Sequence, residues 1–464
     1  MRISWRACRP ALSQALHKRA SSIRLPRRVV ADNRPITKVQ TIIIKPTSKH
    51  PALQRQAAES FSELRLRGDV VDALGNIGLS QPTVTQMLTI PHILKGRNVL
   101  CAAETGSGKT LAYLAPVISE LRREEAEEGV VPRLRRPRAL VVLPSRDLAS
   151  QVLAVAKSLC HVARFRAVGL IRGGKKRNIR NSLLSPVDLA VTTPDALLQF
   201  RRQEQIQLSD VRFLVVDEAD TLFDRSFQEA TTSIIRTIKA STTKPLSGAD
   251  QQPDRGGAQV IAVAATLSTH LMESLQSLVP SVSVVTTKSL HKILPHIEQR
   301  FHKVTQTEKA DKLLSIIREC PGDVFMVFCN TVSSCDWTSH FLQTNRTPVT
   351  TLHAGFRASS RKDLIRPFSE GETRVLVCTD LASRGIHHEK VTHVILFDFP
   401  HTMVDYLHRV GRTGRVGSAN ANCRASILMT HRQDVKTAWQ IKDAAEKREA
   451  IMNQKMNKRL QSLS

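Results

Sequence analysis

Short apolar segments recur along this chain in two series, and they constrain its fold more than any other feature. Each segment is rich in Val, Ile and Leu and is apolar at consecutive positions, which predicts parallel strands buried on both faces. The stretches between the segments are long enough for the crossover helices of βαβ units. The segments are 98–102, 139–143, 188–192, 213–216 and 259–264, then 324–329, 348–352, 374–378, 393–397 and 424–429. They predict an α/β protein with two doubly wound parallel-sheet domains in tandem, joined near residues 285–305.

The rest of the chain differs in composition from these two series. A length of 464 residues suits two or three domains. The expected divisions are a basic leader at 1–30, a linker at 31–59, domains at 60–285 and 300–430, and a mixed-charge helical tail at 431–464. Residues 120–138 and 240–258 are expected to be exposed insertions, because they are charged or rich in Ser, Thr, Gly and Pro.

The charge balance indicates an anionic partner. There are 68 Lys and Arg residues against 41 Asp and Glu, which gives a net charge of +27. Nucleic acid is the first candidate, because each phosphate that Lys or Arg contacts releases counterions; a solvated basic surface is the alternative. The eight cysteines include no Cys-x-x-Cys pair, which argues against a structural zinc site. No apolar run approaches the ~20 residues that span a bilayer, so membrane insertion is not expected.

A glycine-rich turn after the first apolar segment predicts a phosphate-binding loop. It follows a predicted strand and precedes a predicted helix, as such a loop requires. The loop residues are Ala103, Glu104, Thr105, Gly106, Ser107, Gly108, Lys109 and Thr110. The glycines let the backbone N–H groups wrap around phosphate oxygens. Lys109 would reach the β and γ phosphates of ATP, and the Thr110 hydroxyl would bind Mg²⁺.

An acidic quartet closes another apolar segment at Asp217-Glu218-Ala219-Asp220. Ligands of α/β sheets bind where the strands end, so these carboxylates are expected beside the phosphate loop. Asp217 would hold Mg²⁺ through water. Glu218 would orient and deprotonate the water that attacks ATP.

Arginines near the end of the second domain predict a further part of the same chemistry. In His408-Arg-Val-Gly-Arg412-Thr-Gly-Arg415, arginines fixed on one domain can reach across a cleft to a γ-phosphate on the other. Arg412 and Arg415 would neutralise the charge of the transition state. His408 would link this cleft to the acidic quartet. An arginine-rich surface loop is the alternative reading.

Together, these motifs resemble the DEAD-box family of RNA helicases, and the chain resembles this family in order from about residue 60 to 430. The resemblance implies two tandem RecA-like domains, ATP and Mg²⁺ as cofactors, and an ATPase stimulated by RNA. The segment from Phe61 to Thr83 and Gln86 resembles the family's adenine-reading Q motif. The Gln86 amide offers both a donor and an acceptor, which suits adenine.

The resemblance also implies a path for one RNA strand across both domains. The implied RNA-binding residues are Pro144, Arg146, Gly174, Thr193, Pro194, Arg361 and Thr379. Contacts to phosphates position the strand and read no sequence, whereas contacts to 2′-hydroxyls distinguish RNA from DNA. Asp220, Ala264 and Thr266 match the family's positions that couple ATP hydrolysis to strand separation. Closure over ATP would then bend one strand and expel its partner, which is local unwinding.

Several positions depart from the family pattern. Ala264 replaces a serine of the coupling motif, and Asp195-Ala196 replaces the usual Gly-Arg after Thr193-Pro194. His387 replaces an aspartate that helps to bind ribose. Leu79 and Ala358 also replace an aromatic and a glutamine. These changes leave two hypotheses: a helicase that unwinds RNA, or an RNA clamp whose ATP use regulates residence rather than unwinding.

The basic leader at 1–30 predicts a subcellular location. Its basic residues are Arg2, Arg6, Arg9, Lys18, Arg19, Arg24, Arg27 and Arg28, and Asp32 is the first acidic residue. An Arg-rich, acid-free, amphipathic segment is typical of a mitochondrial transit peptide; a basic RNA-binding arm or a nucleolar signal is the alternative. Removing these eight charges from +27 still leaves about +19, so the basic excess is not confined to the leader.

Within the family, 101–109 and 290–299 resemble a vertebrate mitochondrial branch linked to large ribosomal subunit assembly and also associated with the nucleus. That resemblance implies mitochondrial rRNA as the substrate, ribosomal assembly proteins as partners and a monomeric state. The tail at 431–464 either contacts RNA, covers the second domain or forms a solvated helix.

Overall fold

The computed structural model describes residues 41–44, 60–171, 181–224, 226–238, 257–287, 290, 297–353, 355–356, 361–380, 390–414 and 423–446. The chain separates into two units, Met1–Val39 and Gln40–Ser464, and all that follows concerns the second. The leader at 1–30 lies outside the described residues. Among the residues described, no helix has the length and apolar character needed to cross a membrane.

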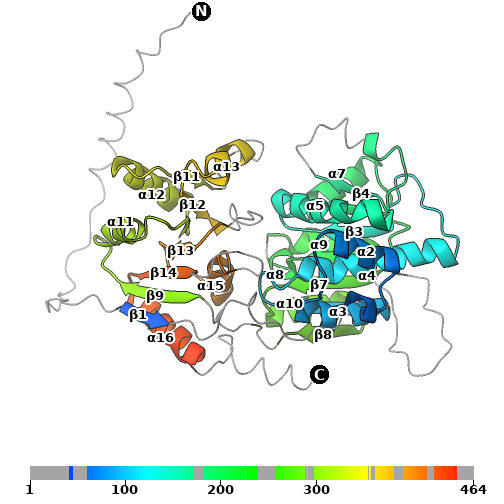
Figure 1. Ribbon diagram of the computed structural model, residues 1–464, viewed down its shortest axis with the longest axis horizontal. Helices are drawn as coiled ribbons and strands as arrows, with labels where there is room; N and C mark the ends of the chain where they lie inside the picture. Colours follow the sequence, from blue (N-terminus) through cyan, green and yellow to red (C-terminus); the bar gives the residue numbers. More distant parts are fainter. Residues whose placement is uncertain are drawn as a thin grey trace, which may run out of the picture. The chain divides into compact units, whose positions relative to one another are not determined.

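The first domain is a parallel sheet in the strand order β4-β5-β3-β6-β7-β2-β8 (Figure 1). Its strands are β2 (Asn98–Ala102), β3 (Ala139–Val142), β4 (Ala167–Leu170), β5 (Leu189–Thr192), β6 (Phe213–Asp217), β7 (Gln259–Ala264) and β8 (Val282–Thr286). The helices are η2 (Phe61–Leu64), α2 (Gly68–Asn76), α3 (Val84–Leu94), α4 (Lys109–Glu127), α5 (Arg146–Ala163), α7 (Pro194–Arg202), α8 (Ala219–Leu222), α9 (Gln228–Ile238) and α10 (Thr269–Leu278).

Helices cover both faces of this sheet, which explains the consecutive apolar residues of its strands. On β2, Val99 and Cys101 enter the core beneath α2 to α5, whereas Leu100 and Ala102 enter the core beneath α7 to α10. Every strand of the sheet pairs in parallel with its neighbours. The predicted doubly wound parallel architecture is therefore confirmed for this domain.

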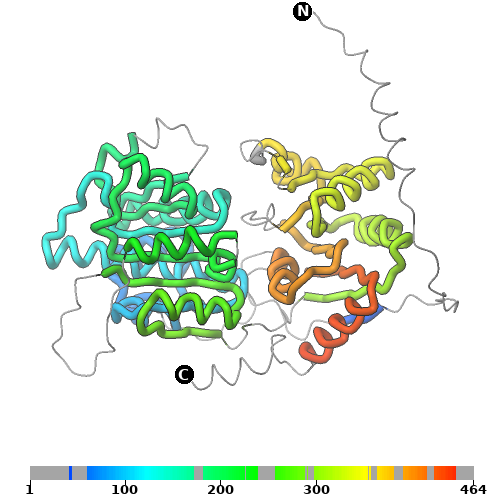
Figure 2. The backbone as a smooth tube through the Cα atoms, turned by 180° about the vertical axis from the view of Figure 1, so that it is seen from behind, coloured from blue at the N-terminus to red at the C-terminus, as the bar shows by residue number. Residues whose placement is uncertain are grey.

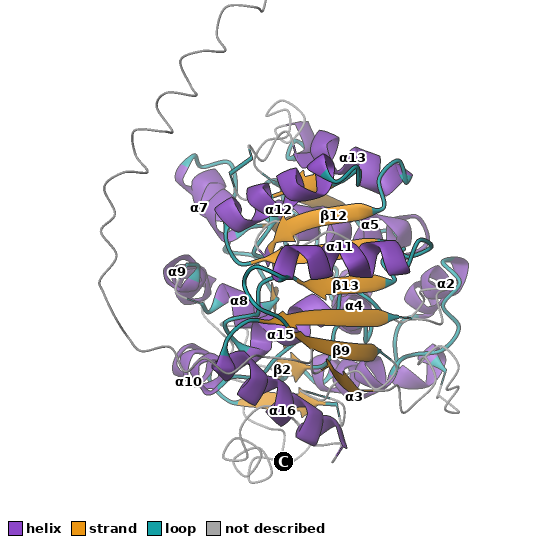
Figure 3. Ribbon diagram, turned by 90° about the vertical axis from the view of Figure 1, so that its left-hand side faces the viewer, coloured by secondary structure: helices purple, strands orange, loops and turns teal. Residues whose placement is uncertain are grey.

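The second domain has the strand order β1-β9-β14-β13-β10-β12-β11. Its strands are β1 (Thr41–Ile44), β9 (Glu298–Lys303), β10 (Phe325–Cys329), β11 (Thr350–Leu352), β12 (Val375–Thr379), β13 (His393–Leu396) and β14 (Arg424–Met429). Helices α11 (Lys309–Glu319) and α12 (Val332–Thr344) border one core, and α13 (Arg361–Glu370), α15 (Met403–Val410) and α16 (Arg432–Glu446) border the other. Figure 3 faces this sheet, with β12, β13 and β9 one above another. All neighbouring pairs are parallel except β1 with β9.

The edge of the second sheet is built from the two ends of the described chain. Residues 41–44 fall in the interval expected to be a linker, yet they form β1, which pairs with β9 from Thr41 to Ile44. The predicted tail begins with α16, and its Ala438 and Ile441 are buried in the second domain's core. β1, in blue, lies beside α16, in red, in Figures 1 and 2. Of the alternatives for the tail, the described part covers the domain.

The segment that joins the two domains is shorter than predicted. β8 ends at Thr286 in the first sheet, and β9 begins at Glu298 in the second. Of the two expected insertions, 120–138 is helical as far as Glu127, at the end of α4. Most of the other, residues 239–256, lies outside the described residues.

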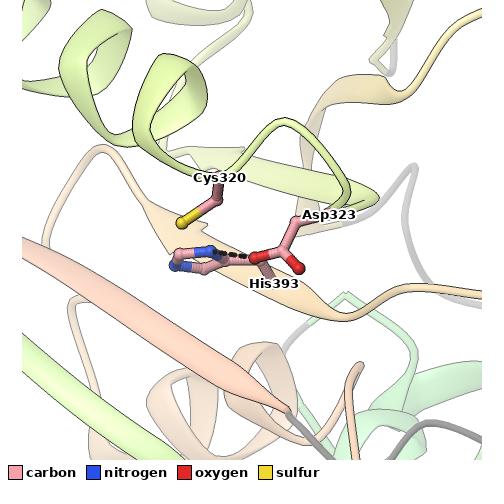
Figure 4. A group of neighbouring side chains, drawn as sticks. All are labelled: Cys320, Asp323 and His393. Carbon is pink, nitrogen blue, oxygen red and sulfur yellow. Dashed lines mark hydrogen bonds and ion pairs between the residues drawn. The ribbon is translucent and has the colours of Figure 1, made fainter.

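A polar cluster lies at the amino ends of β10, β13 and β14 in the second sheet (Figure 4). Cys320, Asp323 and His393 offer sulfur, oxygen and nitrogen atoms within 4.8 Å of one another, a set that resembles a metal site. However, one Arg424 nitrogen lies 3.2 Å from Cys320 Sγ and 3.6 Å from Asp323 Oδ2. The guanidinium already supplies the positive charge there. His393 also bonds Ser426 at 2.8 Å, so the cluster joins β13 to β14.

Candidate nucleotide and RNA site

The predicted site residues of the first domain gather at one edge of its sheet. The phosphate loop follows β2, Pro144 follows β3, Thr193 follows β5, Asp217 ends β6 and Ala264 ends β7. Because all these strands are parallel, their carboxyl ends share that edge. This is where α/β sheets bind ligands.

The phosphate loop closes tightly against α3. Gly108 has φ of +86°, and a Cβ there would lie 2.7 Å from Gln86 Nε2, so the position requires glycine. Lys109 begins α4, and its Nζ donates to the carbonyls of Ala103 and Glu104, both at 2.7 Å. Burial lowers the pKa of Lys109. Ser107 Oγ is buried and has no hydrogen-bond partner among the described residues, as expected of a group that awaits a ligand oxygen.

Thr83 and Gln86 connect this loop to the helix that precedes it. They form a capping box at the start of α3, with Gln86 Oε1 accepting from the Thr83 N–H at 2.8 Å. Thr83 Oγ1 donates to the Ser107 carbonyl at 2.8 Å, and Gln86 Nε2 donates to the Gly108 carbonyl at 3.1 Å. These bonds place the Gln86 amide directly against the loop. Phe61, in contrast, is 3% exposed and packs in the core, so the structure gives its ring a packing position.

The carboxylate of Asp217 is held on both of its oxygens. Tyr113 OH donates to Oδ2 at 2.9 Å, and the Glu218 N–H donates to Oδ1 at 2.8 Å. Burial and the neighbouring Glu218 carboxylate raise the pKa of Asp217 to about 6. Tyr113 was not predicted as a site residue. Its signal in the sequence is its place on α4, one helical turn after Lys109.

Oxygen donors suited to Mg²⁺ meet around the same tyrosine. Thr110 and Tyr113 lie one helical turn apart at the start of α4, so the tyrosine that bonds Asp217 lies on the same face of the helix as Thr110. Mg²⁺ prefers hydroxyl, water and carboxylate oxygens, and it is bound in such sites by one or two carboxylates together with substrate phosphates. Thr110 and Asp217 therefore fit the predicted metal.

Asp220 accepts hydrogen bonds from several directions on one oxygen. Thr266 donates to Oδ2 through its N–H at 2.9 Å and its hydroxyl at 2.8 Å, and the Ala265 N–H lies at 3.2 Å. His408 Nε2 of α15 is 3.3 Å from the same oxygen. Burial alone would raise the pKa of Asp220, but the His408 and Thr266 contacts hold it well below its usual value. The structure thus brings together the predicted residues Asp220, Thr266, His408 and Ala264, with the Ala264 carbonyl accepting from the phosphate-loop residue Ala103 at 3.2 Å.

Arg409 anchors the motif of the second domain and was not predicted as a site residue. Its side chain is 1% exposed and reaches both oxygens of Asp380, at 2.7 and 2.6 Å. It also donates to Asn330 Oδ1 at 2.7 Å and to the Asp398 carbonyl at 3.0 Å. These bonds join the ends of β10, β12 and β13 to α15. These contacts could not be predicted from the sequence, because Asp380 and Arg409 are 29 residues apart.

The turn after α15 carries the predicted arginine fingers. Arg412 is half-buried there, and the Gly411 carbonyl accepts from the Thr105 hydroxyl of the phosphate loop at 3.4 Å. Arg415 lies outside the described residues. One predicted finger is therefore placed beside a residue that contacts the loop.

The implied RNA residues are placed at strand and helix ends. Arg146 begins α5 and is half-buried, and Thr193 caps α7, where Pro194 is the first residue. Thr379 ends β12, and its buried Oγ1 has no hydrogen-bond partner among the described residues. A second orphaned hydroxyl at an implied ligand position again suits an absent polar partner. Pro144 is buried after β3; Gly174 and the Arg361 side chain lie outside the described residues.

Comparisons with known proteins agree with this geometry. Residues 83–275 match the family model described as DEAD/DEAH box helicase, and residues 308–417 match the helicase conserved C-terminal domain. The chain is 35% identical to DEAD-box ATP-dependent RNA helicase 39 of Arabidopsis thaliana, over 86% of this chain and 63% of that protein. It is also 35% identical to the human Probable ATP-dependent RNA helicase DDX28, over 86% of this chain and 76% of that protein.

A solved structure supports the fold. S. cerevisiae Dbp5 bound to RNA and ADP BeF3 superimposes with a TM-score of 0.69 at 22% identity, over 84% of this chain and 94% of that chain. At this identity the likeness establishes the arrangement of two RecA-like domains and no more. The chain spans 63% of the plant relative's length, so it corresponds to part of that longer protein.

Proposed function

Because this chain belongs to the DEAD/DEAH box helicase family, we propose that it is an ATP-dependent RNA helicase that locally unwinds or remodels structured RNA. The observation that carries the proposal is the oxygen of Asp220. This oxygen contacts Thr266 of the first domain and His408 of the second. Asp220 follows the predicted Mg²⁺ ligand Asp217 by three residues in the sequence. A change at the nucleotide can therefore reach both domains.

Named groups divide the chemistry of ATP hydrolysis among them. Lys109 would bind the β and γ phosphates, and Thr110 and Asp217 would hold Mg²⁺, Asp217 through water; a bound Mg²⁺ would supply positive charge beside the phosphates. Glu218 orients the attacking water and accepts its proton. Arg412 and Arg415 approach from the second domain and stabilise the charge of the transition state.

RNA would bind along the carboxyl edges of both sheets. The expected contacts are those of Arg146, Thr193, Arg361 and Thr379 to phosphates and 2′-hydroxyls, which hold a strand without reading its bases. The relatives are named RNA helicases, and the orphaned hydroxyl of Thr379 supports a polar ligand at that point.

A duplex-displacement assay tests the function. A labelled RNA duplex with an unpaired overhang should release its strand with ATP, and Lys109→Ala should abolish release together with nucleotide binding. RNA retained with ATP but never released would favour the clamp instead. Stimulation of the ATPase by DNA as strongly as by RNA would remove the RNA preference.

The clamp alternative rests on residues of this chain. Ala264 offers no hydroxyl to the acidic quartet, and Asp195 places an exposed negative charge in the first turn of α7, close to Thr193. A negative charge on the RNA path weakens phosphate binding. His387 lies outside the described residues, so the assay, and not the geometry, decides between the two functions.

We further propose mitochondrial rRNA as the substrate, during assembly of the large ribosomal subunit, with the matrix as the main location and the nucleus as a second. The support is the acid-free leader at 1–30 and the resemblance of 101–109 and 290–299 to the mitochondrial branch. Residues 1–30 fused to a fluorescent reporter should direct it to mitochondria, whereas the same segment with its arginines changed to glutamine should not. A diffuse or purely nuclear signal would defeat the address, and crosslinking in cells would identify the RNA.

A further inference from the structure

An arginine-lined cavity of about 1000 Å³ opens on the first domain, away from the nucleotide site. Arg135 and Arg136 line it from the 120–138 insertion, Arg201 from the last turn of α7, and Arg212 from the turn before β6. Glu204 is the one acidic residue among the described lining residues. Four guanidinium groups against one carboxylate leave a positive surplus in the lining.

Nearby carboxylates neutralise only part of this charge. Asp210 lies 3.4 Å from Arg136, but it is shared with Arg133 at 2.6 Å. Glu124 lies 3.2 Å from Arg212. These two arginines are thereby fixed in place.

The remaining arginines have no carboxylate partner within 4.0 Å in the part of the chain that the structure describes. Arg201 donates to the Thr237 hydroxyl at 2.9 Å, which aims its guanidinium across the gap between α7 and α9. Arg135 is exposed, and its carbonyl accepts from the Gln207 N–H at 2.9 Å, which fixes the insertion against the cavity. Both guanidinium groups can therefore pair with an anion from outside.

Apolar residues contribute a smaller part of the cavity lining. Ile206, Val211 and Ile238 are largely buried and line it beneath the arginines. Guanidinium groups pair with phosphates, and their planar faces can stack on the bases of unpaired nucleotides. A duplex keeps its bases stacked inside and offers no such face.

The position of the cavity separates it from the site described above. Val211 and Arg212 precede β6 and Asp217 ends it, so the two sites lie at opposite edges of the sheet. Five residues of strand correspond to about 16 Å. Helix α7 connects the edges, because it begins beside Thr193 on the implied RNA path and ends at Arg201 and Arg202 (Figure 1). Its nine residues span about 13 Å, a distance that a few nucleotides cross.

We propose that this cavity is a second RNA-binding surface, which takes unpaired nucleotides that continue beyond the strand held at the carboxyl edges of the sheets. It binds phosphates without reading sequence. The proposal rests on the RNA-helicase function proposed above and extends it to the single-stranded flank of a substrate.

Binding of two single-stranded RNAs to the full chain tests the proposal, with a non-hydrolysable ATP analogue present. One RNA covers only the path at the carboxyl edges, and the other carries extra unpaired nucleotides at both ends. The test variant is Arg135→Glu with Arg201→Glu. The matched control is Lys157→Glu with Arg318→Glu, which makes the same charge change at exposed positions outside both sites.

We expect the wild type to bind the longer RNA at least fivefold more tightly than the short one. The cavity variant should lose this advantage and still bind the short RNA as the wild type does. Its salt dependence on the longer RNA should fall by about 1.4 in slope, because two phosphate contacts on a single strand are removed. The control pair should keep the advantage of the longer RNA.

Each other result has a defined meaning. Equal binding of the two RNAs by the wild type, or equal weakening by the cavity and control variants, would overturn the proposal. An advantage that survives in the cavity variant, with an acidic peptide held by the wild type alone, would assign the cavity to protein. Failure of the wild type to bind the short RNA would instead defeat the proposed function. The milder pair Arg135→Gln with Arg201→Gln, with an unchanged melting temperature, separates lost contacts from misfolding.

Discussion

Asp217 and Glu218 are neighbours with different constraints. Tyr113 and the chain fix the Asp217 carboxylate, whereas Glu218 is half-buried and keeps a side chain that can turn toward water. Glu218 also has φ of +50°, a left-handed conformation that costs a non-glycine residue of order 1–3 kcal/mol. Because protein donors hold both oxygens of Asp217, Glu218 is the better candidate for the base.

The exchange Glu218→Gln removes that base without changing size. We expect ATP affinity to stay within about twofold, while RNA-stimulated turnover falls by about 10²–10⁴, the usual contribution of a general base. Phosphate release and nucleotide binding measure the two effects. Glu372→Gln is a matched control, because it makes the same exchange at an exposed position before β12 of the second domain. Turnover near wild type in Glu218→Gln would remove this residue as the base.

Tyr113 would be a positioning residue for the proposed metal, because its hydroxyl bonds Asp217 and it lies one helical turn after Thr110 on α4. Tyr113→Phe keeps the buried ring and removes only that hydroxyl. A hydrogen bond to a charged group contributes about 1.5–3 kcal/mol, so the Mg²⁺ concentration for half-maximal ATPase should rise about tenfold or more. The rate at saturating Mg²⁺ should stay close to wild type.

The other tyrosine of the chain provides the control for this prediction. Tyr406 is buried in the second domain, and its hydroxyl bonds Gln299. Tyr406→Phe should lower stability and leave the Mg²⁺ requirement unchanged. If Tyr113→Phe behaved in the same way, the Tyr113 hydroxyl would have only a packing role.

At the level of elements, β1 belongs to the second domain although it precedes the whole first domain in the sequence. Its side chains alternate: Ile42 is 8% exposed and joins the core, and Ile43 is 44% exposed. Without β1, the hydrogen-bonding edge of β9 would be open to another chain. If the proposed transit peptide is cleaved, the cleavage should therefore leave Thr41 in place.

Substitutions in β1 test this reasoning on neighbouring residues of one type. Ile42→Asp buries a charge and removes an apolar side chain whose burial contributes about 1.5–3 kcal/mol, so the second domain should melt earlier. Ile43→Asp changes an exposed position and should have little effect. Deletion of residues 1–40 should leave stability unchanged, and deletion of 1–44 should lower it. Equal melting of both deletions would show that β1 contributes nothing.

His302, on β9, should make the stability of the folded chain depend on pH. Burial lowers the pKa of His302 to about 4, and its Nε2 has no partner among the described residues. The unfolded chain binds a proton near pH 6.5 and the folded chain only near pH 4. Stability is therefore full above pH 6.5 and falls as the pH drops through this window, by about 3 kcal/mol at most. His302→Gln should flatten that slope in denaturant titrations; an unchanged slope would assign it to other groups.

Strand prediction succeeded where burial on both faces made the sequence apolar. β2, β7 and β14 begin and end at the predicted residues, because every position between contacts a core. β9 was missed because its sequence is Glu-Gln-Arg-Phe-His-Lys, in which Gln299 is fully buried. Its side chain bonds Tyr406, 107 residues away, and no local pattern reveals that partner.

The site shows the same division between local and distant information. The phosphate loop and the acidic quartet are contiguous in sequence, so their chemistry was readable from motifs. Tyr113 and Arg409 were missed as site residues because their partners lie 104 and 29 residues away. Site residues that lie in one contiguous segment could be predicted. The contacts that position their side chains could not, because they depend on how the strands are ordered in the sheets.

For the whole molecule, Asp220 is the point where the two halves of the mechanism meet. Its neighbour Glu218 belongs to the chemistry of ATP, and its oxygen is shared between Thr266 and His408. In the proposed function, communication between nucleotide and RNA would therefore require no long chain of contacts. One carboxylate contacts the coupling segment and the second-domain helix at the same time, and the lowered pKa of Asp220 keeps it charged.

His408→Ala should lower RNA-stimulated ATP hydrolysis and duplex displacement together without disturbing either binding site. The contact to Asp220, at 3.3 Å, is a hydrogen bond to a charged group, which contributes about 1.5–3 kcal/mol. We therefore expect RNA-stimulated ATPase and duplex displacement to fall by about 10- to 100-fold, while Lys109 still binds nucleotide with unchanged affinity. His408→Gln keeps a donor and should recover part of the loss. Wild-type displacement by His408→Ala would mean that Asp220 couples the domains through Thr266 alone, and loss of nucleotide affinity would place His408 in the nucleotide site instead.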